Sequence, residues 1–104
     1  MRIITHDDGR CLTLRLLGEL DHAAAQEVMP GIEDAVEEYL PRRCVLDLSG
    51  LSFMDSSGIG LIMGRYRAMG MRGDCIRATG VSAYIEKLLH LSGVYKFVEI
   101  CREV

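Results

Sequence analysis

The sequence predicts an α/β domain, with a mixed β-sheet whose central strands are parallel and with α-helices packed mainly on one face. The first observation is that strand patterns alternate with helical patterns, and that the links between them are short. Because crossovers between parallel strands are right-handed, they place consecutive helices on the same face of the sheet. The second observation is size: 104 residues, 49% of them hydrophobic, match one domain whose core needs no metal or disulfide.

The chain begins with a predicted hairpin. Strand patterns cover 2–5 and 11–17, and the turn between them contains Asp8 and Gly9, a pair favoured in tight hairpin turns. The first two strands are therefore expected to be antiparallel neighbours.

A long amphipathic helix is predicted after Asp21. Its apolar stripe consists of Ala25, Val28, Met29, Ile32, Ala35, Val36 and Tyr39. Pro30 and Gly31 interrupt this stripe, and a proline inside a helix costs about 3 kcal/mol. We therefore expect a kink or a split near Met29.

The remaining elements follow in βαβ order. We predict strands at 44–48, 74–78 and 95–100, helices at 57–69 and 82–91, and a turn at 70–73. In the last helix Ile85, Leu88 and Leu89 are expected to point inward, and Gly93 is placed to cap the C-terminus.

The segment 51–60 joins an apolar strand to an amphipathic helix. It places Asp55, Ser56 and Ser57 at the expected helix start. A serine at this position can cap the helix by accepting a backbone N–H hydrogen bond, or it can offer its oxygen to solvent for phosphorylation. The junction is the predicted functional surface.

Three glycines in the second helix need an explanation, because each interior glycine costs about 0.5 to 1 kcal/mol relative to alanine. Gly58, Gly60 and Gly64 could allow close packing against the sheet, which the four-residue spacing of the last two favours. Alternatively, they could leave an open surface beside Ser56 that a partner's backbone approaches.

Enzyme chemistry is not expected. A serine hydrolase favours glycine two residues before and after its nucleophile, whereas Met54 and Asp55 precede Ser56. No glycine-rich run ends in Lys and Ser or Thr, and Asp55 would repel a nucleotide phosphate. The chain is therefore predicted to need no cofactor.

Charge and composition limit the partners. With 12 basic and 15 acidic side chains the net charge is −3, which gives no electrostatic footprint for nucleic acid or an anionic membrane. No apolar run approaches the roughly 20 residues that span a bilayer, and Met1 leads directly into a strand pattern. We expect a cytoplasmic protein that binds a protein partner or a small ligand.

Four cysteines stand far apart, without the paired spacing of zinc or redox sites. They are Cys11, Cys44, Cys75 and Cys101. We interpret them as buried free thiols that act as small hydrophobic residues, with metal or disulfide roles as the alternative.

Several motifs carry a family resemblance. Residues 51–58 read Leu Ser Phe Met Asp Ser Ser Gly, with Gly60 and the Gly Arg Tyr of 64–66 behind them. Further matches are Gly Glu Leu Asp His at 18–22 and Leu Ser Gly at 91–93. On these residues the sequence resembles the anti-sigma factor antagonists, above all those of sporulation. The resemblance covers nearly all of 1–104, as one STAS domain.

The resemblance implies a fold of mixed sheet and packed helices, and a regulatory role in transcription. In this family an unphosphorylated antagonist binds an anti-sigma factor that is also a serine kinase, and so releases the sigma factor. The kinase, with its own ATP and magnesium, phosphorylates the serine after the aspartate, which is Ser56 here. A serine phosphatase resets the phosphorylated form. The alternative is a STAS scaffold subunit of a stress-signalling or lipid-transport complex, without a switch.

The resemblance also implies roles for the neighbouring residues. Asp55 is the acidic neighbour of the acceptor, and Gly58 and Gly60 flank the contact with the partner. Asp21 is expected to meet a basic group on the anti-sigma factor, although plain N-capping would explain it too. Ser57 is the weaker acceptor candidate.

Overall fold

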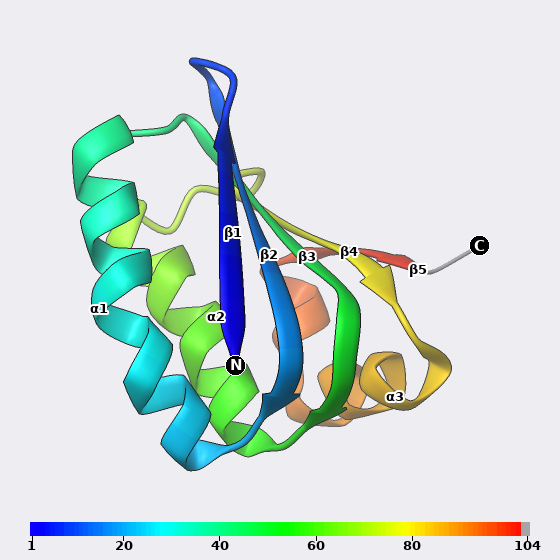
Figure 1. Cartoon of the computed structure of the whole chain (residues 1–104). Helices are drawn as coiled ribbons and strands as arrows, with labels where there is room; N and C mark the ends of the chain where they lie inside the picture. Colours follow the sequence, from blue (N-terminus) through cyan, green and yellow to red (C-terminus); the bar gives the residue numbers. More distant parts are fainter. Residues whose placement is uncertain (103–104) are drawn as a thin grey trace.

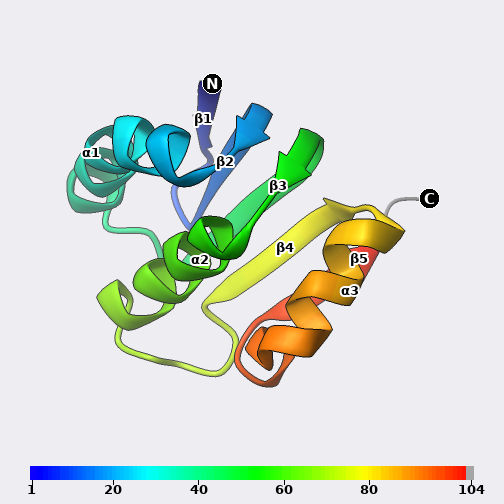
Figure 2. The same cartoon turned by 90° about the horizontal axis from the view of Figure 1, so that it is seen from below.

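The computed structural model describes residues 1–102 and contains one five-stranded sheet with α-helices on a single face (Figures 1 and 2). The elements are β1 (Arg2–Asp7), β2 (Cys11–Leu20), α1 (His22–Tyr39), β3 (Arg43–Met54), α2 (Ser56–Ala68), β4 (Ile76–Val81), α3 (Ala83–Ser92), the 3-10 helix η1 (Val94–Lys96) and β5 (Glu99–Arg102). The strand order is β1-β2-β3-β4-β5, antiparallel between the first two and parallel elsewhere. The predicted fold class is confirmed.

The core lies between the sheet and the helices. Successive side chains of a strand point to opposite faces, so every second residue of β2, β3 and β4 faces the helices. The buried strand residues include Leu12, Leu14, Leu16, Leu46, Leu48, Ile76 and Ala78, and the helices add Ile32, Leu61, Ile62, Ile85 and Leu89. The expected inward positions of the last helix are confirmed for Ile85 and Leu89, while Leu88 is partly buried against the core.

All three α-helices begin at the same edge of the sheet, where the parallel strands end (Figure 1). Each helix has a side-chain N-cap. Asp21, Asp55 and Ser82 accept backbone N–H hydrogen bonds at 2.8, 2.8 and 3.3 Å. These caps satisfy donors that a helix start otherwise leaves without partners.

The first helix crosses Pro30 without a split. It runs unbroken from His22 to Tyr39, so the predicted split near Met29 is wrong. Pro30 lies on the exposed side of α1, where water can satisfy the carbonyl group that the missing N–H leaves free. Tyr39, expected in the buried stripe, is 41% exposed at the helix end.

Two strand predictions have the wrong bounds. β3 continues to Met54 instead of ending at 48, because it keeps pairing with β2 through bulges up to the pair of Leu20 and Met54. β4 covers Ile76–Val81 instead of 74–78. Its Gly80, with φ +64°, forms an irregularity inside the strand instead of a turn that ends it.

The predicted last strand at 95–100 is also wrong in its position. Gly93 caps α3 in the left-handed conformation, as expected, and the chain then forms η1 with Val94 buried. The strand starts only at Glu99. Val94 and Val98 therefore anchor this turn to the core, whereas Tyr95 and Phe97 are exposed.

The cysteine prediction holds for two residues of four. All four cysteines are free thiols; Cys44 and Cys75 are buried, whereas Cys11 and Cys101 are partly exposed. Cys11 alternates with the buried Leu12, so it points to the face of the sheet opposite the helices.

Candidate functional site

Ser56 is the first residue of α2, at the edge of the sheet where the three helices begin (Figure 1). Its side chain is exposed, whereas that of Ser57 is partly buried. The expected position at a helix start is therefore confirmed for both serines. Of the two hydroxyl groups, Ser56 is the more accessible to another protein.

Asp55 holds the helix start in place. Its Oδ1 accepts the N–H of Ser57 at 2.8 Å, and its carbonyl oxygen accepts the N–H of Gly58 at 3.0 Å. Its own N–H donates to the carbonyl oxygen of Leu20 at 3.3 Å. Because Asp55 provides the N-cap, the capping role considered for Ser56 is not needed, and the Ser56 side chain is exposed.

Asp21 lies at the same edge. Leu20 and Met54 are paired across β2 and β3, so the residues that follow them, Asp21 and Asp55, start two adjacent helices. Asp21 is exposed and caps α1 through Ala24. The structure thus brings two carboxylates and the Ser56 hydroxyl to one edge, and it confirms capping for Asp21 without testing a contact to a partner.

The three glycines of α2 divide into two kinds. A Cβ on Gly58 would clash with the side chain of Met54 and would lie 3.1 Å from Cδ2 of Leu20, so this buried position needs glycine for close packing. A Cβ on Gly60 or Gly64 would meet nothing within 4 Å. The packing hypothesis is therefore wrong for these two, and Gly60 leaves an exposed, open surface one helical turn after Ser56.

Two exposed aromatic residues, one next to the end of β3 and one at the start of α3, lie at the same end of the sheet and were missed in the sequence. Phe53 is 39% exposed, and Tyr84 in the first turn of α3 is 57% exposed. The Tyr84 hydroxyl donates to the carbonyl oxygen of Met54 at 3.2 Å, which ties α3 to the end of β3. The alternation of Phe53 with buried Met54 could have indicated an outward residue, but Tyr84 carries no local signal because its contact depends on the strand order.

Residues 1–102 contain neither a cluster of metal-ligating side chains nor a membrane-spanning helix. This part of the chain contains no group of three or more His, Cys, Asp or Glu residues arranged to hold a metal ion. None of its helices is long and apolar enough to cross a membrane.

A mixed five-stranded sheet, with capped helices starting around an exposed serine at one edge, defines a small α/β domain. The family model of the STAS domain matches residues 2–104, and the chain belongs to this family.

The similar proteins agree with this assignment. The chain is 37% identical over 89 residues to the anti-sigma F factor antagonist of Paenibacillus polymyxa. This alignment covers 86% of this chain and 76% of that protein. The solved structure of the anti-sigma factor antagonist SpoIIAA in its unphosphorylated form has 27% identity and a TM-score of 0.80, covering 98% of this chain and 90% of that one. The structure of the phosphorylated form of the Bacillus cell fate determinant SpoIIAA has a TM-score of 0.72 at 27% identity, over 98% and 93% of the two chains. The resemblance seen in the sequence motifs is confirmed.

Proposed function

We propose that this chain is an anti-sigma factor antagonist, a STAS domain spanning 1–104 that regulates transcription by partner switching in the cytoplasm. Its unphosphorylated form binds an anti-sigma factor that is also a serine kinase, and the sigma factor is released. Phosphorylation of Ser56 ends this binding, and a serine phosphatase restores it. The chain acts as a binding module and carries out no catalysis itself.

The observation that carries the proposal is the exposed Ser56 hydroxyl directly after a capping aspartate, in a chain similar to named antagonists over most of its length. The kinase transfers the γ-phosphoryl group of ATP to Oγ of Ser56, with release of ADP and a proton. Hydrolysis by the phosphatase returns the hydroxyl and inorganic phosphate. Both reactions need an accessible oxygen, which Ser56 offers more than the partly buried Ser57 does.

The partner surface proposed here surrounds Ser56. Asp21 and Asp55 supply negative charge for a basic group of the anti-sigma factor, Phe53 and Tyr84 supply exposed apolar area, and Gly60 admits a close approach. Aromatic residues are enriched at the centres of interfaces, and charged residues such as aspartate are more typical of their polar rim.

Phosphorylation changes the interface more than the fold. A phosphate at a helix N-terminus is favoured locally by about 0.3 to 1 kcal/mol, so α2 has no reason to unfold. The modification adds about 1.5 to 2 negative charges beside Asp55 and Asp21. The anti-sigma factor would have to accommodate the bulk of this phosphate and remove its water, and burying an unpaired charge costs several kcal/mol, while about 5.5 kcal/mol moves a population from 1:99 to 99:1. The switch therefore acts locally, at the interface.

The test compares Ser56→Ala, Ser56→Asp and the Ser56-phosphorylated protein by calorimetry with the anti-sigma factor. The partner is recovered from cells by pull-down with Ser56→Ala, which binds but cannot be phosphorylated at this position. We expect Ser56→Ala to bind like the unmodified protein and the phosphorylated protein to bind at least about a hundredfold more weakly, with Ser56→Asp between them because aspartate carries less charge.

Ser57→Ala is the matched control, since it changes a neighbouring hydroxyl and leaves Ser56 in place. It should still accept one phosphate and lose binding when it does. Equal binding of the phosphorylated protein and Ser56→Ala would contradict the proposal, as would phosphate found on Ser57 alone.

A further inference from the structure

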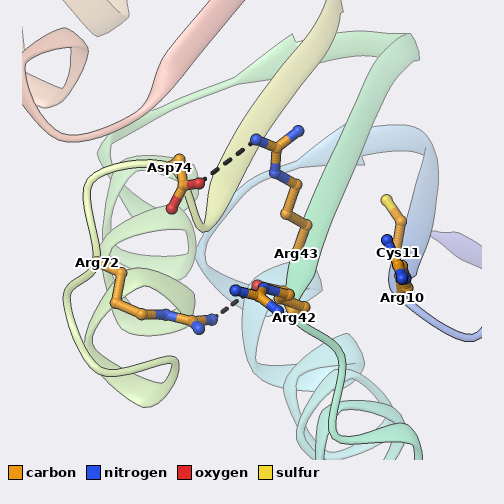
Figure 3. Close-up of a pocket in the computed structure, with 6 residues that line it drawn as sticks. All are labelled: Arg10, Cys11, Arg42, Arg43, Arg72 and Asp74. Atoms are coloured by element: carbon orange, nitrogen blue, oxygen red, sulfur yellow. Dashed lines mark hydrogen bonds and ion pairs between the residues drawn. The ribbon is translucent and has the colours of Figure 1, made fainter.

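A basic pocket lies at the edge of the sheet opposite Ser56. It is close to the first residues of β2 and β3, whereas Ser56 follows the last residue of β3. The pocket has a volume of about 420 Å³ (Figure 3). Its lining residues are Arg10, Cys11, Arg42, Arg43, Arg72 and Asp74.

Backbone hydrogen bonds bring three separate loops together around this pocket. The carbonyl oxygen of Arg10 accepts the N–H groups of Arg42 and Arg43 at 2.9 and 3.1 Å, which joins the β1–β2 turn to the start of β3. Nη2 of Arg72 donates to the carbonyl oxygen of Arg42 at 2.7 Å, which adds the loop before β4 (Figure 3). These contacts fix the backbone of Arg10 and Arg42 and the guanidinium group of Arg72 relative to one another before any ligand arrives, and such preorganisation lowers the cost of binding.

The charges in the pocket are unbalanced. Arg43 lies 3.4 Å from Asp74, but both side chains are largely exposed, so this ion pair is weak. Within residues 1–102, no carboxylate lies within ion-pair distance of Arg10, Arg42 or Arg72. Four arginines thus face one aspartate in a chain whose net charge is −3. An anion in the pocket would relieve this repulsion.

The lining indicates which anion fits. Guanidinium groups are planar forks that bind phosphate oxygens with paired hydrogen bonds. A volume of about 420 Å³ suits a small molecule. However, no aromatic or aliphatic side chain is among the lining residues, so a large apolar group would find little to pack against there. The pocket therefore has to recognise its ligand by negative charge and small size.

We propose that this pocket is a binding site for a compact polyphosphate group, either free polyphosphate or the phosphates of a larger metabolite. The arginines hold the phosphate oxygens, and Asp74 orients Arg43 through their ion pair. The site is separate from the Ser56 surface, so it does not depend on the function proposed above.

The test is calorimetry with tripolyphosphate in metal-free buffer. We expect saturable binding of one tripolyphosphate per chain. Arg10→Gln and Arg42→Gln should each weaken it about tenfold or more, because each removes hydrogen bonds to a charged group. Arg2→Gln is the matched control: it removes the same charge from an exposed strand position outside the pocket and should leave the affinity within about twofold.

A second readout uses Cys11, a partly exposed thiol in the pocket lining. In a Cys101→Ser background, tripolyphosphate should slow alkylation of Cys11, and it should not do so once Arg10 and Arg42 are both glutamine. Equal affinities for ATP and tripolyphosphate would assign recognition to the phosphate chain alone, whereas a higher affinity for ATP would point to a larger metabolite; both results support a polyphosphate site.

Three results would overturn the proposal. One is binding that does not saturate. Another is equal weakening by Arg2→Gln and Arg10→Gln, which would mean diffuse attraction by the whole surface. The third is a hexaglutamate peptide that binds as tightly as tripolyphosphate, which would assign the pocket to an acidic protein segment.

Discussion

The backbone N–H of Asp55 donates to the carbonyl oxygen of Leu20 at 3.3 Å, one step beyond the last pair of β2 and β3. This hydrogen bond continues the sheet to the first turns of α1 and α2. Both Asp21 and Asp55 are then held next to each other by backbone contacts, and Ser56 follows them on a fixed helix start. The proposed partner surface therefore exists before the partner binds.

The N-cap of α2 should contribute measurably to stability. Asp55→Ala removes the oxygen that accepts the N–H of Ser57, and we expect the free energy of unfolding to fall by about 1 kcal/mol. Asp55→Asn keeps an oxygen acceptor and should lose much less. Urea denaturation of both variants measures the difference. Equal stability of the alanine and asparagine variants would show that the hydrogen bond contributes nothing.

A single substitution at Asp21 can test its two roles, helix capping and charge, independently. Asp21→Asn should keep the stability of the protein, because asparagine caps a helix as well as aspartate. If the carboxylate meets a basic group of the anti-sigma factor, the same variant should raise the Kd at least about fivefold, or about 1 kcal/mol. Asp34→Asn, an exposed change elsewhere on α1, is the control for net charge. Unchanged affinity in Asp21→Asn would leave capping as the only role of Asp21.

The glycines of α2 should respond in opposite directions. Gly58→Ala forces a methyl group against Met54 and Leu20, and overpacking of this kind costs about 1 to 3 kcal/mol. Gly60→Ala meets no neighbour and should stabilise the helix by about 0.5 to 1 kcal/mol, while it weakens binding of the anti-sigma factor. Gly64→Ala is the control, with the same gain and a smaller effect on binding. Thermal unfolding and calorimetry measure the two effects, and a loss of stability in Gly60→Ala would contradict the open surface.

Local sequence patterns predicted which helices and strands the chain forms better than they predicted how these elements pair and pack. The cap at Asp21 and the start of α2 are coded within a few residues, and they were predicted, whereas the cap of α2 was considered for a serine and is provided by Asp55. The end of β3 was not predicted, because Ser49 and Gly50 read locally as a turn, and only the pairing with β2, which resumes at Leu17 and Gly50 after a register shift, keeps them in the strand.

The residues of the candidate sites were also hard to predict from local sequence, because their roles depend on tertiary contacts. Gly58 and Gly60 look alike in the sequence, and only the neighbours of their Cβ positions distinguish packing from an open surface. The basic pocket combines Arg10, Arg42 and Arg72, which come from three loops far apart in the chain. No spacing rule joins such residues, so the pocket appears only with the tertiary structure.

The cysteines should divide by reactivity. Burial raises the pKa of the Cys44 thiol to about 12, so it stays protonated and therefore unreactive in the folded protein. At about pH 8, near the ordinary range of a free thiol, iodoacetamide should modify the partly exposed Cys11 and Cys101 and spare the buried Cys44 and Cys75. Mass spectrometry with and without concentrated urea checks this, and rapid labelling of Cys44 in the folded protein would contradict it.

Arg65 is a buried charge with weak compensation. It is 5% exposed on α2, its Nε has no hydrogen-bond partner within residues 1–102, and one Nη donates to Sδ of Met29 at 3.4 Å. The nearest carboxylate, that of the exposed Glu33, lies 3.8 Å away. Taking a guanidinium out of water costs several kcal/mol, which one distant and hydrated partner does not offset.

Replacing Arg65 with an apolar side chain of similar volume should therefore leave the protein as stable or make it more stable. We expect Arg65→Met to change the free energy of unfolding by between zero and about +4 kcal/mol, because methionine fills the space between α1 and α2 without a desolvation cost. Arg65→Ala is the control for volume: it leaves a cavity and should destabilise the protein by about 2 kcal/mol or more. Urea denaturation of the two variants measures both values. A loss of stability in Arg65→Met as large as in Arg65→Ala would show that the charge itself holds the two helices together.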